Sequence, residues 1–111
     1  MKYFIDEKTR KQLGSSCYFE FQKGLSDEFW RDDSLLLHAD IFDDMKLAKI
    51  FKEGLDNFNY YGNTVISAEQ WDRFYSFAIS KNKEAAELFS ELNDWAKECY
   101  KDNDVIVIIG I

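Results

Sequence analysis

The sequence has few of the residues that catalytic and metal sites require. It contains one histidine, His38, and two cysteines, Cys17 and Cys99, which lie far apart in the chain. There is no zinc-type Cys pair, no glycine-rich phosphate loop, no serine nucleophile elbow and no His-Glu helix motif. We therefore predict that the protein is not an enzyme and has no catalytic residue, metal or cofactor.

Two cysteines are also too few for the disulfide framework of a small secreted domain. Both occupy apolar positions of periodic segments, so we predict buried, free thiols. The segment Met1 to Glu7 turns acidic soon after its apolar residues, unlike a secretory signal peptide. The longest apolar run, Val105 to Ile109, is far shorter than the about 20 residues that span a membrane. We expect a cytoplasmic protein.

Basic residues are scarce beyond the first part of the chain. The net charge is −7: residues 1–25 hold five basic and three acidic side chains, and the rest hold nine and eighteen. Nucleic acids and anionic membranes both recruit Lys and Arg, so this balance argues against either as a partner. A field of this sign attracts a basic protein.

The apolar content is ample. Ten Phe, six Tyr and three Trp within a 46% hydrophobic composition exclude a disordered chain. There is no internal repeat, low-complexity tract or proline, and 111 residues suit one domain spanning residues 1–111.

The periodicity predicts an α+β fold. Alternating apolar residues at 17–21 favour a strand, with a short partner strand at 2–5, whereas residues 24–40 fit a helix start or a short strand. Three helices are expected at about 40–58, 67–80 and 83–100, the second opening with a capping box of Ser67 and Gln70. Residues 105–109 are apolar on both faces, which predicts an interior strand. The prediction is a small sheet with about three helices packed on it.

The last predicted helix carries a row of carboxylates. Their spacing of three and four residues aligns them over about 21 Å, which suits either a solvated helix face or a docking edge for Lys and Arg. This acidic row comprises Glu84, Glu87, Glu91, Asp94 and Glu98.

A second acidic cluster surrounds an aromatic pair, Phe29 and Trp30. Carboxylates beside an aromatic anchor such as Trp30 predict a binding surface for a cationic protein. Alternatively, Asp40, Asp43 and Asp44 favour the positive end of a helix dipole, or bind a hard cation, although no calcium-loop spacing supports a metal. The cluster comprises Asp27, Glu28, Asp32, Asp33, Asp40, Asp43 and Asp44.

In size, acidity and overall composition the chain resembles the small immunity proteins of bacterial toxin systems, including contact-dependent growth inhibition. Residues 62–67 (Gly-Asn-Thr-Val-Ile-Ser) and 69–72 (Glu-Gln-Trp-Asp) share the character of such proteins. The resemblance implies direct binding of a cognate toxin domain, often a basic nuclease, inside the producing cell. The basic segment Lys2 to Lys11 departs from an all-acidic inhibitor.

Two other functions are compatible with the sequence. One is a structural or regulatory module that forms a homodimer or larger homo-oligomer through aromatic surface or the terminal strand. The other is an enzyme with an unrecognised carboxylate site. Salt dependence distinguishes partner binding from self-association. Binding of a basic partner by carboxylates weakens as ionic strength rises, whereas apolar self-association does not.

Overall fold

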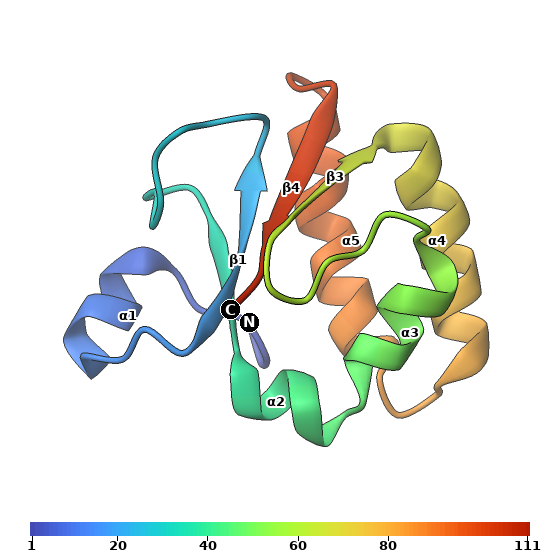
Figure 1. The fold of residues 1–111 in the computed structure, drawn as a ribbon, viewed down its shortest axis with the longest axis horizontal. Coiled ribbons are helices and arrows are strands. Elements are labelled where there is room, and N and C mark those ends of the chain that lie inside the picture. The colour runs from blue at the N-terminus through green and yellow to red at the C-terminus, as the bar shows by residue number, and fades with distance from the viewer.

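The computed structural model describes residues 1–111 as one four-stranded sheet and five helices. The predicted α+β class is confirmed, with two short helices beyond the three expected (Figure 1). In chain order the elements are α1 (Glu7–Leu13), β1 (Tyr18–Lys23), β2 (Leu35–His38), α2 (Ala39–Asp44), α3 (Leu47–Gly54), β3 (Asn63–Ser67), α4 (Ala68–Lys81), α5 (Ala86–Tyr100) and β4 (Val105–Ile109).

The sheet is entirely antiparallel, in the order β2-β1-β4-β3. The last strand, β4, pairs with β1 on one side and β3 on the other, so the prediction of an interior terminal strand is confirmed. The two edges are partly occupied. Ile5 forms a two-bond bridge with Leu36 of β2, and the Asn57 side-chain amide donates to the Val65 carbonyl of β3 at 2.8 Å.

The inner face of the sheet packs against α3, α4 and α5, which Figure 1 shows together on one side. Phe19 and Phe21 of β1 point into this core, where Phe42, Phe51 and Phe74 stack in series from three helices. The one large polar pair of this core is satisfied, because the indole N–H of Trp71 donates to Asn93 Oδ1 at 2.9 Å. Helix burial therefore depends on aromatic contacts.

The outer face is covered by α1 and by residues 24–34, which we call the acidic loop. Figure 1 shows both on the opposite side of the sheet from α3, α4 and α5. Leu36 of β2 is fully buried on this face, whereas Val65 of β3 is exposed. The outer face is thus closed over β1 and β2 and more open towards β3.

The helices differ in detail from the prediction. The predicted helix over residues 40–58 is two helices, because Lys46 adopts a left-handed conformation (φ 55°) that separates α2 from α3. Helix α5 begins at Ala86, so Glu84 precedes it. The capping box of Ser67 and Gln70 is confirmed, with both reciprocal hydrogen bonds present.

The prediction for the cysteines is half correct. Cys99 is buried on α5 and burial raises the pKa of its thiol to about 11. The prediction that Cys17 is buried is wrong: Cys17 is exposed and lies just before β1, which begins at Tyr18. Both thiols are free. No helix in the structure has the length and apolar character needed to cross a membrane.

Candidate protein-binding surface

Glu20 organises the outer face. It lies at the centre of β1, where the strand alternation points its side chain away from the core, and it is 2% exposed. Its carboxylate accepts hydrogen bonds from the backbone N–H groups of Trp30 (2.9 Å) and Arg31 (3.0 Å) and from the Ser34 hydroxyl (2.7 Å). A buried carboxylate with three donors fixes the segment that provides them, so Glu20 anchors the acidic loop onto the sheet.

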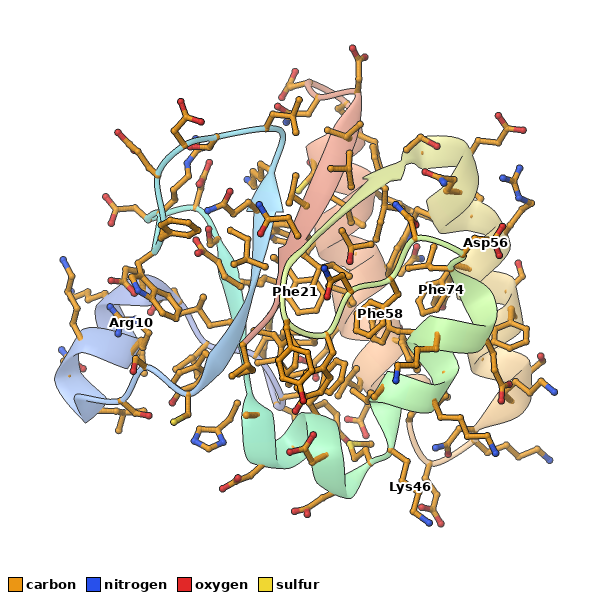
Figure 2. All side chains as sticks on the ribbon, in the orientation of Figure 1. Arg10, Phe21, Lys46, Asp56, Phe58 and Phe74 are labelled. Carbon is orange, nitrogen blue, oxygen red and sulfur yellow. The ribbon has the colours of Figure 1, made fainter.

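Trp30 is held in an unusual conformation at this anchor. Its φ of 58° is left-handed, which is costly for a bulky residue and needs support from surrounding contacts. That support comes from Glu20 on one side and Arg10 of α1 on the other, because the guanidinium carbon lies 4.0 Å from the centre of the Trp30 ring. Figure 2 shows Arg10 on this side of the sheet, away from Phe58 and Phe74.

Arg10 is itself fixed by neighbouring groups. It forms a two-pronged ion pair with Glu7, whose side chain is almost fully buried, and donates to the Ser15 carbonyl at 3.0 Å. The Arg10 hydrogen bonds hold the pKa of Glu7 below its ordinary value. The short helix α1 therefore works as a brace for Trp30, and part of the basic N-terminal segment serves the fold.

A cleft opens beside Trp30, between the acidic loop, the start of β1 and the end of β4. We call it the outer cleft: a cavity of about 280 Å³ whose apolar walls are Tyr18, Phe29, Trp30, Ile109 and Ile111. Phe29 is 62% exposed and Ile111 50% exposed, although both are large apolar residues. Exposed aromatic and aliphatic groups around a concavity are typical of a protein-binding surface.

Carboxylates flank the cleft residues along the acidic loop. Asp27, Glu28 and Asp32 are exposed and form no ion pair, and Asp33 pairs only with Arg31, at 3.6 Å. The base of the loop adjoins the turn that carries Asp102 and Asp104, because the Gly24 N–H donates to the Val105 carbonyl at 3.0 Å. The structure thus adds two carboxylates that lie far away in the sequence.

The carboxylates of α2 are placed differently. Asp40 stands in the first turn, where His38 Nδ1 accepts from its N–H at 3.0 Å, so His38 caps the helix. Asp43 and Asp44 stand in the last turn, so the helix-dipole explanation is wrong for these two. Asp43 accepts from the Tyr60 hydroxyl at 3.0 Å. No three acidic, histidine or cysteine side chains converge as metal ligands.

The acidic row on α5 is largely engaged within the molecule. Glu91 accepts from the backbone N–H groups of Lys2 (3.1 Å) and Tyr3 (3.3 Å), and Glu87 pairs with the Lys2 ammonium at 3.2 Å. Glu98 pairs with Lys101 at 2.8 Å. Only Asp94 and Glu84 form neither an ion pair nor a side-chain hydrogen bond. The row therefore holds the N-terminal segment, so charge reversal at Glu91 would disturb the fold, which a fully solvated helix face would not.

The sequence pattern indicated the acidic loop and Trp30 but not the residues that complete the surface around them. It missed Tyr18, Glu20, Ile109, Asp102 and Asp104. The one available signal was Glu20, a charged residue at the centre of a predicted strand.

Comparison of the chain with protein-family models, with curated proteins and with solved structures gives no match.

Proposed function

We propose that this protein binds a basic protein domain through the acidic loop and acts as an immunity protein that neutralises a toxin domain. One observation carries the proposal: four carboxylates flank Phe29 and Trp30 within the acidic loop, and three of them have no ion pair. Unpaired surface carboxylates steer a cationic partner and raise its association rate. The aromatic groups between them supply the apolar contact that gives affinity.

A binding role is favoured over catalysis by what the candidate reactive groups do. The only histidine uses Nδ1 to cap α2, and the Cys99 thiol is buried with a pKa of about 11. Neither residue lines the outer cleft, so the cleft receives no general base from His38 and no nucleophile from Cys99. The free state of both thiols is consistent with action in the cytoplasm of the producing cell.

Co-expression tests this proposal. The chain should protect a bacterial host from the product of the neighbouring reading frame, and the two purified proteins should form a complex whose association slows as salt rises. Protection without a complex, or no protection from a neighbouring product that is toxic when expressed alone, would contradict the proposal.

Self-association is a second candidate, favoured by the exposure of Phe29 and Ile111 at the outer cleft. It predicts a dimer whose stability is insensitive to salt, because apolar burial is not screened. Sedimentation at two salt concentrations separates the two candidates.

A further inference from the structure

The outer cleft has the dimensions of a side-chain pocket. Its volume of about 280 Å³ lies at the lower limit of small-molecule sites, which span roughly 300–1,000 Å³. Such a space suits one large side chain better than a cofactor. Its side-chain walls are apolar apart from the Ser16 hydroxyl and the Glu20 carboxylate, and this carboxylate already accepts three hydrogen bonds.

The hydrogen bonds already made by Glu20 determine which kind of group the outer cleft favours. Donors from Trp30, Arg31 and Ser34 occupy three lone-pair sites of this carboxylate, and Glu20 is only 2% exposed, so it has little capacity left to pair with a cation inside the cleft. The free carboxylates lie outside, on the loop at Asp27, Glu28 and Asp32. An apolar group is therefore matched to the interior and positive charges to the rim.

The wall at Trp30 is formed before any partner binds. Glu20 fixes its backbone and Arg10 stacks on its ring, so docking against it costs little conformational entropy. Phe29 forms another wall and is 62% exposed, so a partner can reach it. A tryptophan held in place beside a concavity is typical of an energetic centre within an interface.

A second copy of the chain is a poor occupant. A two-fold dimer places the same patch of both subunits together, which would bring the carboxylates of the two acidic loops to one interface. Like charges at a desolvated interface are unfavourable. The negative charge around the outer cleft favours a basic partner instead.

From these observations, and resting on the proposed function, we infer that the outer cleft binds one large apolar side chain presented by a basic segment of the partner. An aromatic or long aliphatic group fills the space between Tyr18, Trp30 and Ile109. Lys or Arg residues on either side of it pair with Asp27, Glu28 and Asp32.

Peptide titrations test the inference on the full-length chain. The probes are three peptides: acetyl-Lys-Lys-Trp-Lys-Lys-amide, the same peptide with Ala in place of Trp, and the same peptide with Glu in place of each Lys. Binding is measured from the NMR shifts of the protein's backbone amides. The tryptophan peptide should bind about tenfold more tightly than the alanine peptide and shift Tyr18, Phe29, Trp30 and Ile109, whereas the glutamate peptide should not bind.

A cleft-filling variant gives the decisive comparison. Ser16 is exposed, lines the cleft and makes no side-chain hydrogen bond, so Ser16→Phe should occupy the space without disturbing the core. The matched control is Ser76→Phe, at an exposed position on α4. Ser16→Phe should remove the advantage of the tryptophan peptide, and Ser76→Phe should retain it.

Three results would overturn the inference. If the two cationic peptides bind equally and shift only the acidic loop, the charge-based function stands but the cleft has no anchor role. If neither binds at low salt, the proposed function loses its electrostatic basis as well. If the chain sediments as a dimer that Ser16→Phe dissociates, the occupant is a second copy.

Discussion

Glu20 illustrates how one side chain positions a surface. Replacing Glu20 with Gln keeps the size of the side chain but replaces one acceptor oxygen with an amide NH₂ group. This NH₂ donor would then face the backbone N–H or hydroxyl donor that the oxygen had accepted from. We predict that Glu20→Gln lowers the free energy of unfolding by about 1–3 kcal/mol, the cost of an unsatisfied buried group. Urea denaturation measures it, with Glu84→Gln as an exposed control that should change stability little. Equal stability of the two variants would show that Glu20 does not anchor the loop.

The two cysteines provide a second test at this scale. Burial raises the pKa of Cys99 to about 11, so near neutral pH its thiol is both shielded and protonated, whereas Cys17 is exposed. A thiol-specific dye should label one equivalent rapidly in the native protein and two after denaturation. Cys17→Ser should remove the rapid phase; rapid native labelling that survives this substitution would place Cys99 at the surface.

At the scale of elements, the sequence predicted the elements that bury an apolar stripe. Helix α4 was predicted from its capping box, and β4 from its unbroken apolar run. Helix α1 was not predicted, because Lys8, Arg10 and Lys11 provide no apolar face. Its support is the Asp6 cap, which accepts from the Thr9 N–H at 2.9 Å, together with the ion pair of Glu7 and Arg10 and the contact with Trp30. Such long-range contacts have no periodic signal in the sequence.

Gly54 shows the same limit of local reasoning. By helix propensity alone, a glycine at the end of α3 weakens the helix by about 1 kcal/mol, so alanine should stabilise it. In the structure a Cβ at this position would lie 2.5 Å from Phe74 Cδ1 and 2.9 Å from Phe77 Cδ2 of α4. We predict that Gly54→Ala destabilises the protein by about 1–3 kcal/mol through overpacking. Thermal unfolding measures it, with Ser90→Ala, at an exposed position of α5, as the control. A stabilised Gly54→Ala would mean that α3 and α4 do not pack this closely.

At the scale of the whole molecule, the sequence located the carboxylates but not their surroundings. In the sequence the acidic loop and the acidic row are both runs of like charge, and the pattern does not show which carboxylates are paired within the molecule. The fold separates them, because Glu87 and Glu91 hold Lys2 and Tyr3 while Asp27, Glu28 and Asp32 remain unpaired. This also accounts for part of the basic N-terminal segment: Lys2 and Arg10 each pair with a carboxylate of this chain. We therefore place the binding surface at the acidic loop, where the carboxylates are unpaired and lie beside apolar side chains.

The most direct test of the proposed binding surface compares two variants of equal net charge. Asp27→Lys, Glu28→Lys and Asp32→Lys reverse the acidic loop, whereas Asp44→Lys, Asp56→Lys and Asp72→Lys reverse three exposed carboxylates that also lack ion pairs. Figure 2 shows Asp56 on the side of the molecule away from the loop. Both triple variants should fold, because all six side chains are exposed.

The measurement is the association rate with the product of the neighbouring reading frame, at low and at high salt. We predict that the loop variant associates at least several-fold more slowly at low salt and loses most of its salt dependence, while the distal variant stays close to the wild type. Equal rates for the two triple variants would show that net charge alone governs association. Full-rate binding by the loop variant together with slow binding by the distal one would place the interface elsewhere.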